Sequence, residues 1–255
     1  SKKRDEYWGK VITYSKKVFV PLTNMCRDTC GYCTFVKHPD DPEAKIMSPQ
    51  EVLVSAQKAE KKGCKELLFS LGEKPELRYS KPKKALKALG YETMTDYLQD
   101  MCELVLEETH LLPHINAGTL SQYELKKLKN VSASMGMMLE TTSKRLNKKG
   151  EAHYACPDKV PIQRIRTLIA AGICKVPFTT GILIGIGETF EERVEALLLI
   201  EKINNTYGHI QEVIIQNFQR KPDIAMSEHP EPTLNEMLLT IALARIILSP
   251  SISIQ

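Results

Sequence analysis

Short apolar runs alternate with amphipathic segments along the chain. The runs have the alternation and β-branching of buried strands, and each is followed by apolar residues at helical spacing. We predict six strands, at residues 18–22, 66–71, 111–116, 131–138, 176–184 and 212–217. Because successive strand–helix units give parallel strands with right-handed crossovers, this pattern predicts an α/β fold that closes towards a parallel (β/α) barrel of at least six units.

Capping boxes indicate where four of the helices begin. In each box a serine or threonine precedes a glutamate by three residues, so that each side chain accepts a hydrogen bond from the other residue's backbone. The pairs are Ser48 and Glu51, Ser121 and Glu124, Thr189 and Glu192, and Thr233 and Glu236. We also expect a lysine-rich helix within residues 74–90, a helix starting at Thr95, polar helical segments at 142–149 and 159–171, and helix ends at Gly63, Gly172 and Gly208.

Residues 251–255 alternate like the beginning of a seventh strand, directly after Pro250 ends the last helix. A domain rarely ends where an extended segment has just begun. We therefore expect one barrel domain over residues 1–255, from a sequence that is cut before its C-terminal strands.

Composition excludes several classes of protein. Charged residues make up 26% of the 255 residues, and the net charge of +4 is not concentrated in a basic arm, so nothing favours nucleic-acid binding. Residues 1–17 lack the apolar stretch of a signal peptide, and no run approaches the ~20 apolar residues of a membrane span. We expect a protein of the reducing cytoplasm with no membrane partner.

Seven cysteines is an odd number, and three of them have the spacing of a metal-binding cluster, which argues against a secreted disulfide framework. Three of them form a cluster near the N-terminus. We expect Cys64, Cys102 and Cys174 to be core residues, because they lie in helix or strand patterns. Cys156 lies in a predicted loop, and its role stays open.

The cluster itself, Cys26, Cys30 and Cys33, follows the first strand directly. Its spacing allows one loop to wrap a soft-metal centre, and Gly31 permits a turn that a β-carbon would hinder. An iron–sulfur cube has four irons, so three cysteines leave one iron open for another ligand. A structural zinc site is the alternative, with a distant fourth ligand such as His38.

This CxxxCxxC motif, with Tyr32 before the last cysteine, resembles the signature of the radical S-adenosylmethionine (SAM) enzymes. The resemblance implies a 4Fe-4S cluster held by the three cysteines, with the open iron chelating the amino and carboxylate groups of SAM. It also implies that an electron from the cluster breaks a carbon–sulfur bond and yields a 5′-deoxyadenosyl radical.

Two further motifs resemble SAM-binding segments of that superfamily. Gly72-Glu73 follows the second strand and resembles the motif that holds the methionine amino group, although the usual double glycine is here Leu71-Gly72. The segment Gly181 to Glu188 resembles the GxIxGxxE strand that packs on the adenine, and it supplies Gly185 and Glu188. Taken alone, the first motif could be a surface turn and the second a nucleotide site of another kind.

Glu140 and Arg164 complete the candidate SAM contacts. Glu140 follows the fourth strand, where it is placed to reach a ribose hydroxyl or an amino group. Arg164 is the candidate for the SAM carboxylate by resemblance to relatives such as biotin synthase, with Arg166 as the second choice. Each could instead be an ordinary surface charge.

Five stretches together resemble one family closely, the CofG-type subunit of 7,8-didemethyl-8-hydroxy-5-deazariboflavin (FO) synthase. They are residues 70–76, 114–120, 132–136, 178–181 and 214–218, and the resemblance spans nearly the whole chain, although the family continues past Gln255. It implies hydrogen abstraction from the adduct of tyrosine and 5-amino-6-ribitylamino-uracil, followed by ring closure with loss of ammonia, in coenzyme F-420 biosynthesis. It also implies a companion subunit that makes the adduct, and an electron donor such as ferredoxin or flavodoxin.

Amide side chains at predicted strand ends are compatible with such a substrate. Asn116, Gln216 and Asn217 could pair with the uracil edge or the ribityl hydroxyls, or simply satisfy loop backbone. His153-Tyr154 could transfer protons, although a loop histidine is more often solvated. Two alternatives remain for the whole chain: the companion coupling reaction itself, and a non-catalytic iron–sulfur or zinc protein.

Overall fold

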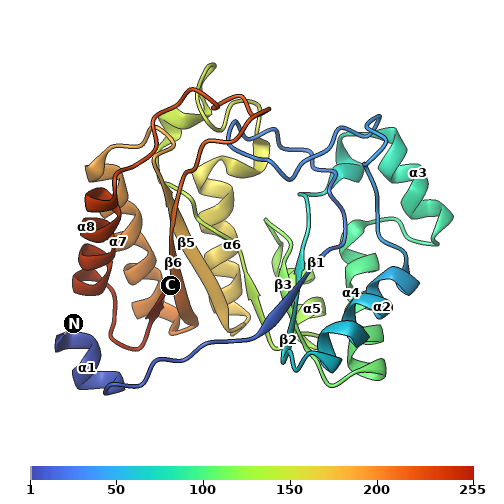
Figure 1. Ribbon diagram of the computed structural model, residues 1–255, viewed down its shortest axis with the longest axis horizontal. Coiled ribbons are helices and arrows are strands. Elements are labelled where there is room, and N and C mark those ends of the chain that lie inside the picture. The colour runs from blue at the N-terminus through green and yellow to red at the C-terminus, as the bar shows by residue number, and fades with distance from the viewer. Residues whose placement is uncertain (1) are drawn as a thin grey trace. The chain divides into compact units, whose positions relative to one another are not determined.

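The computed structural model describes residues 2–255, which form two compact units (Figure 1). The N-terminal unit comprises residues 14–28 and 35–136. The C-terminal unit comprises residues 29–34 and 137–255, together with the start of the chain up to Thr13. Each unit is described by itself, and the single barrel domain over residues 1–255 stays a prediction.

Four parallel strands form the centre of the N-terminal unit. Strand β1 pairs with β2, β2 with β3, and β3 with β4. Helix α2 packs on β1 and on α4, and α4 packs on β3 and on α5 (Figure 1). The elements are β1 (Lys17–Pro21), α2 (Pro49–Lys61), β2 (Glu66–Ser70), η1 (Pro75–Leu77), α3 (Ser80–Ala88), α4 (Met94–Glu108), β3 (Leu112–Asn116), α5 (Gln122–Lys129) and β4 (Ser134–Gly136).

The C-terminal unit repeats the arrangement with strands β5, β6 and β7, which are also parallel and in chain order. Helix α7 packs on β5 and between α6 and α8 (Figure 1). The elements are α1 (Lys2–Trp8), η2 (Lys144–Asn147), η3 (Pro157–Lys159), α6 (Pro161–Ile173), β5 (Phe178–Ile184), α7 (Phe190–Tyr207), β6 (Ile210–Asn217), α8 (Leu234–Ile247) and β7 (Ser253–Ile254).

The predicted parallel α/β organisation is confirmed within both units. All four capping boxes are present, with the side chains and backbone groups paired in both directions. Strand β5 is buried along its whole length, as its continuous apolar sequence predicts. The alternating C-terminal segment does add a strand, because the backbone of Gln255 bonds to Val213 and Ile215 of β6.

The fourth strand is much shorter than predicted. We expected residues 131–138, but only Ser134–Gly136 are extended. The backbone N–H of Val131 and the hydroxyl of Ser132 both donate to the carbonyl of Leu128, so this segment turns back onto the end of α5. An apolar run therefore includes a turn that its hydrophobicity does not reveal.

Helix boundaries also differ from the prediction. Helix α4 is capped by Thr93 rather than starting at Thr95, and the segment at 142–149 is a short 3-10 turn. Helix α6 continues through Gly172, where a β-carbon would lie 2.5 Å from the ring of Tyr207. This glycine therefore allows close helix packing and does not end the helix.

The N-terminal helix α1 was not predicted. The indole N–H of Trp8 donates to the carbonyl of Pro250, which fixes this helix beside the end of α8. Cys64 is half-buried in a loop, so its assignment to the core is wrong, whereas Cys102 and Cys174 are buried.

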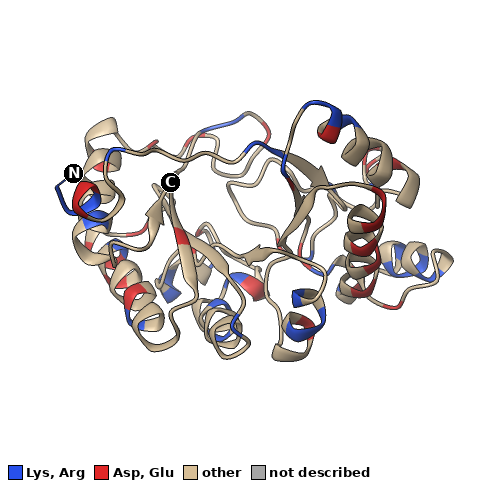
Figure 2. Cartoon of the chain, turned by 90° about the horizontal axis from the view of Figure 1, so that it is seen from below, with Lys and Arg blue, Asp and Glu red and all other residues tan. Residues whose placement is uncertain are grey.

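Charged residues of both signs lie mainly on helices and loops (Figure 2). Within residues 2–255, no helix combines the length and the hydropathy needed to cross a membrane.

The cap of α7 can be tested by substitution. The hydroxyl of Thr189 accepts a bond from the backbone N–H of Glu192, and we expect Thr189→Ala to lower the free energy of unfolding by about 1 kcal/mol. Thr206→Ala is the control. The exposed hydroxyl of Thr206 donates to the carbonyl of Lys202 within the same helix, so its removal should change the free energy of unfolding by less than about 0.5 kcal/mol. Urea unfolding midpoints measure both. Equal losses would contradict the capping role.

Candidate functional site

The three cysteines of the motif are divided between the two units. Cys26 lies in the N-terminal unit, and Cys30 and Cys33 lie in the C-terminal unit. Cys26 is buried, and its sulfur accepts hydrogen bonds from the backbone N–H groups of Asp28 and Glu73, at 3.3 and 3.1 Å. Burial raises the pKa of this thiol to about 12, so the sulfur keeps its proton until a metal replaces it. Backbone N–H donors to sulfur are the environment that iron–sulfur ligands use, so Cys26 fits the cluster.

Glu73 is positioned by a close approach of two loops. A β-carbon on Gly72 would lie 2.0 Å from the carbonyl oxygen of Met25, so only glycine allows this contact. The carboxylate of Glu73 then accepts bonds from the backbone and the hydroxyl of Thr119, both at 2.7 Å. Of the two positions Leu71 and Gly72, the close contact therefore requires a glycine at position 72.

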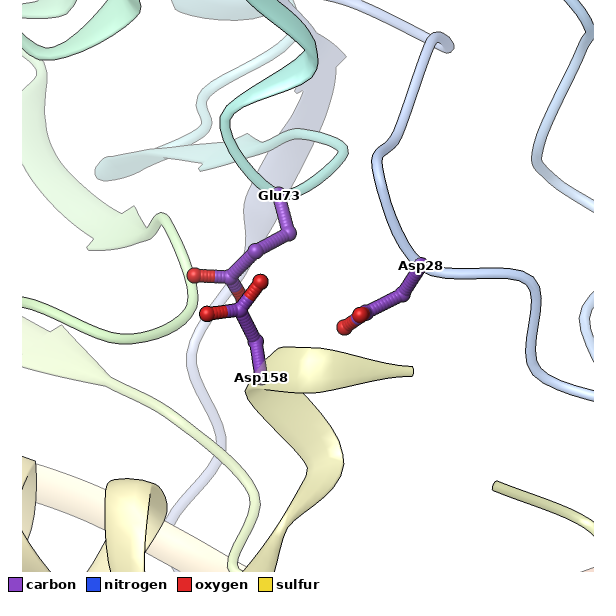
Figure 3. A group of neighbouring side chains, drawn as sticks. All are labelled: Asp28, Glu73 and Asp158. Atoms are coloured by element: carbon purple, nitrogen blue, oxygen red, sulfur yellow. The ribbon is translucent and has the colours of Figure 1, made fainter. Parts of the chain in front are cut away.

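Asp28 and Glu73 form a pair of buried carboxylates in the N-terminal unit. They extend from two different loops, and their oxygens lie within 4.8 Å of each other (Figure 3). Carboxylate oxygens this close together can accept hydrogen bonds from a single cationic N–H donor group. The pair is therefore compatible with the ammonium group of an amino acid moiety. Asp158, which Figure 3 also draws, is a buried residue of the C-terminal unit.

In the C-terminal unit, three loops are joined through the backbone of Gly31. The N–H of Gly31 donates to the carbonyl of Ala152 at 2.8 Å, and the carbonyl of Gly31 accepts from Met226 at 3.0 Å. Beside them the hydroxyl of Tyr32 lies 3.1 Å from Nε2 of His153. These contacts place the loop containing Cys30 and Cys33 against residues 146–160.

The Tyr32–His153 pair is neutral. Burial lowers the pKa of His153 to about 4 and raises the pKa of Tyr32, and the negative charge of Glu140 raises the latter further. The hydrogen bond between the phenol and the imidazole therefore joins two uncharged groups at neutral pH. His153 is buried, so the alternative of a solvated loop histidine is wrong, whereas Tyr154 is half exposed.

Glu140 is a buried carboxylate in a strained backbone conformation. Its φ of 68° is unusual for a residue with a β-carbon, and its backbone bridges β5 by bonds to Gly181 and Leu183. The carboxylate lies 2.5 Å from Nζ of Lys159. Burial by itself would raise the pKa of Glu140, but the charges of Lys159 and Arg164 outweigh it and hold the pKa below its usual value.

Arg164 is also buried, and it anchors the backbone around this carboxylate. Its Nε donates to the carbonyl of Met138, and one terminal nitrogen donates to the carbonyl of Asp158 at 3.1 Å. Arg166 is exposed. The reading of Glu140 and Arg164 as ordinary surface charges is therefore wrong.

The glycine-rich end of β5 is held by Glu188. Gly185 and Gly187 have φ angles of 87° and 104°, which favour glycine. The two oxygens of Glu188 accept bonds from the backbone of Gly185 and Ile186, each at 2.8 Å, and from Nε of Arg193 at 2.7 Å. Glu188 thus shapes the loop from within, and its contact with a cofactor stays a prediction.

The predicted substrate contacts are distributed over both units. Asn116 lies half-buried at the end of β3 in the N-terminal unit. Gln216 is exposed and Asn217 half-buried at the end of β6 in the C-terminal unit. Their pairing with a substrate stays a prediction.

Sequence reasoning missed three residues of this region. Asp28 lies between Cys26 and Cys30, and this position inside the motif could have identified it as a candidate site residue. Lys159 and Cys156 lie in the loop before α6, where no spacing rule points to them. The same loop borders a pocket of about 310 Å³, which is lined by Asn147, His153, Ala155, Cys156, Pro157 and Val160.

Comparison with known proteins agrees with this geometry. Residues 20–200 match the model of the radical SAM superfamily. The chain is 48% identical over 245 residues to a 7,8-didemethyl-8-hydroxy-5-deazariboflavin synthase of Methanopyrus kandleri, covering 96% of this chain and 73% of the relative. It is 49% identical over 249 residues to an FO synthase of Mycobacterium leprae, of which it spans 29%.

Solved structures show the same fold at low sequence identity. The [FeFe]-hydrogenase maturase HydG from Carboxydothermus hydrogenoformans matches 99% of this chain over 55% of its own, with a TM-score of 0.77 and 20% identity. Methylornithine synthase PylB matches 99% of this chain over 67% of its own, with a TM-score of 0.72 and 16% identity. The predicted fold class, a parallel α/β fold of the radical SAM type, is confirmed.

The buried Glu140–Lys159 pair can be tested by removing the lysine. Lys159→Met leaves a buried carboxylate without its nearest cation, and we expect a loss of about 3 kcal/mol in the free energy of unfolding at pH 7. In the wild type, the low pKa of Glu140 stabilises the fold above the usual glutamate pKa. In the variant, burial raises this pKa, so the difference between the two proteins should shrink as the pH falls from 7 towards roughly 4.3.

Two variants serve as controls for this measurement. Adding Glu140→Gln to Lys159→Met should recover part of the loss, because the unpaired charge is gone. The exposed Lys148→Met should change stability by less than about 0.5 kcal/mol. A loss that is independent of pH in urea unfolding between pH 5 and 7 would contradict the role of the ion pair.

Proposed function

We propose that this chain, which belongs to the radical SAM superfamily and within it to the CofG-type FO synthases, makes the deazaflavin precursor of coenzyme F-420. The reaction abstracts hydrogen from the adduct of tyrosine and 5-amino-6-ribitylamino-uracil and closes the ring with loss of ammonia. The observation that carries this proposal is the 48% identity to the Methanopyrus relative, over 96% of this chain and 73% of that one.

The three cysteines of the motif would hold a 4Fe-4S cluster. The donor set is soft, and the buried sulfur of Cys26 receives two backbone N–H bonds, which supports the assignment. When bound, the cluster and SAM together supply a 5′-deoxyadenosyl radical. The backbone N–H of Cys33 donates a hydrogen bond to the carbonyl of Cys30 at 3.1 Å.

Four parts of the chain would bind SAM. The buried carboxylates of Glu73 and Asp28 receive its ammonium group, and Arg164 receives its carboxylate. Glu140 accepts from a ribose hydroxyl, since Lys159 keeps it ionised. The glycine-rich end of β5, with Gly185, would lie against the adenine, and Tyr32 would contribute to the same site.

Substrate and partners follow from the family. Asn116, Gln216 and Asn217 would pair with the uracil edge or the ribityl hydroxyls of the adduct. A companion subunit would supply the adduct, and a ferredoxin or flavodoxin in the cytoplasm would supply electrons.

The test of this function is an anaerobic assay. We expect the chain, reconstituted with iron and sulfide and then reduced, to convert SAM and the adduct into 5′-deoxyadenosine and deazaflavin, both detected by mass spectrometry. Cys30→Ala, which lacks one ligand thiol, is the negative control, and Cys64→Ala, which alters a half-buried loop thiol, is the matched positive control. Formation of the adduct from tyrosine and the diaminouracil, without conversion of added adduct into deazaflavin, would instead support the coupling reaction.

The ammonium site can be tested separately. Glu73→Gln keeps an oxygen for the bonds from Thr119 but removes the charge, and a lost charged hydrogen bond of about 1.5–3 kcal/mol corresponds to a rise in the KM for SAM of roughly 10- to 150-fold. The exposed Glu92→Gln is the control and should leave the KM unchanged. An unchanged KM in Glu73→Gln would remove Glu73 from the site.

A further inference from the structure

A fourth thiol contacts the cysteine loop. The sulfur of Cys156 lies 3.8 Å from the sulfur of Cys30, within the same unit. Cys156 is buried, with 3% of its surface exposed, whereas Cys30 is half-buried. The proposed reaction uses Cys30 as a cluster ligand and gives Cys156 no role.

The contact is built by the fold and not by two flexible side chains. The backbone N–H of Thr29 donates to the sulfur of Cys156 at 3.3 Å. The backbone hydrogen bond between Gly31, next to Cys30, and Ala152, four residues before Cys156, joins the same two loops. Ala155, directly before Cys156, has a φ of 57°, which is unfavourable for a residue with a β-carbon. The structure around the loop therefore maintains a strained turn that brings the sulfur to this position.

We propose that Cys156 is a resolving cysteine that captures Cys30 as a disulfide when iron is lost from the site. Hydrogen peroxide is the oxidant: the Cys30 thiolate attacks it, forming a sulfenic acid and releasing hydroxide. The thiol of Cys156 then attacks the sulfenic sulfur, the S–S bond forms, and water leaves with the sulfenic oxygen. One peroxide is thereby reduced and two thiols are oxidised.

The arrangement suits this chemistry. The outer thiol, Cys30, can meet a solvent oxidant, and the buried thiol is already in van der Waals contact with it. A disulfide requires the sulfurs to approach to about 2.05 Å, a movement that two short loops can accommodate. The disulfide protects Cys30 from irreversible oxidation to the sulfinic acid, and a thiol reductant returns it to the ligand set.

Trypsin separates the relevant cysteines into different peptides, which allows a direct test. Cleavage after Arg27, Lys37, Lys149 and Lys159 leaves Cys30 and Cys33 in residues 28–37 and Cys156 in residues 150–159. The full chain is freed of iron with a chelator, exposed to hydrogen peroxide, alkylated and digested. We expect a cross-linked pair of these two peptides in the mass spectrum, which disappears on treatment with dithiothreitol.

Variants identify the partners. Cys33→Ala and the control Cys64→Ala should keep the cross-link, whereas Cys30→Ala should lose it. Cys156→Ala and Cys156→Ser should accumulate at least fivefold more sulfinic acid at Cys30 under the same peroxide dose. Both should also recover at least fivefold less cluster absorbance after reduction and reloading with iron and sulfide; the serine variant guards against a folding defect, because its oxygen can accept the bond from Thr29.

The outcomes that overturn the proposal are equally defined. They are a wild-type chain without the cross-link, a cross-link that survives in Cys30→Ala, or equal sulfinic acid in the wild type and both Cys156 variants. The formation of the disulfide does not rest on the proposed function. Only its consequence, the loss of a cluster ligand, rests on that function. A chain that makes deazaflavin but forms no cross-link on oxidation overturns the resolving role alone. A chain that forms the cross-link, but makes no deazaflavin after reduction and reloading with iron and sulfide, overturns the proposed function alone.

Discussion

The backbone of Gly31 joins three segments of the C-terminal unit, and the candidate site in that unit depends on this junction. Its N–H bonds to Ala152 and its carbonyl to Met226, while a β-carbon at this position would lie 3.0 Å from the Met226 side chain. Two backbone bonds from one glycine thus fix the direction in which its neighbours Cys30 and Tyr32 leave the loop. The contacts of Tyr32 with His153 and of Cys30 with Cys156 follow from that direction.

Buried charge is the second constraint on this unit. Glu140 and Arg164 are buried, where isolated charges would be costly, and Lys159 is half-buried beside them. Glu140 pairs with Lys159, and Arg164 binds backbone carbonyls. Such a cluster gains little net stability over an apolar core. A carboxylate held in this way is preorganised to accept a hydrogen bond from a hydroxyl group, which supports the proposed role of Glu140.

The N-terminal unit shows the complementary situation, in which negative charges are brought together. Asp28 and Glu73 are buried within reach of each other, and the backbone of both donates to the sulfur of Cys26. Residues 26–28 thus supply a thiol and a carboxylate, and a second loop adds the carboxylate of Glu73. This set of groups supports the proposed binding of SAM by a member of the radical SAM superfamily.

The sequence by itself determined the order of strands and helices, the four capped helix starts and the three-thiol loop, because these depend on local periodicity and on residues close along the chain. It could not determine the turn at Val131 or the continuation of α6 through Gly172, which hydrogen bonding and helix packing set. It also gave no sign of the pairing of Glu140 with Lys159, or of Cys30 with Cys156. The second pair is separated by 126 residues, and only the tertiary structure brings such positions within a few ångströms of each other.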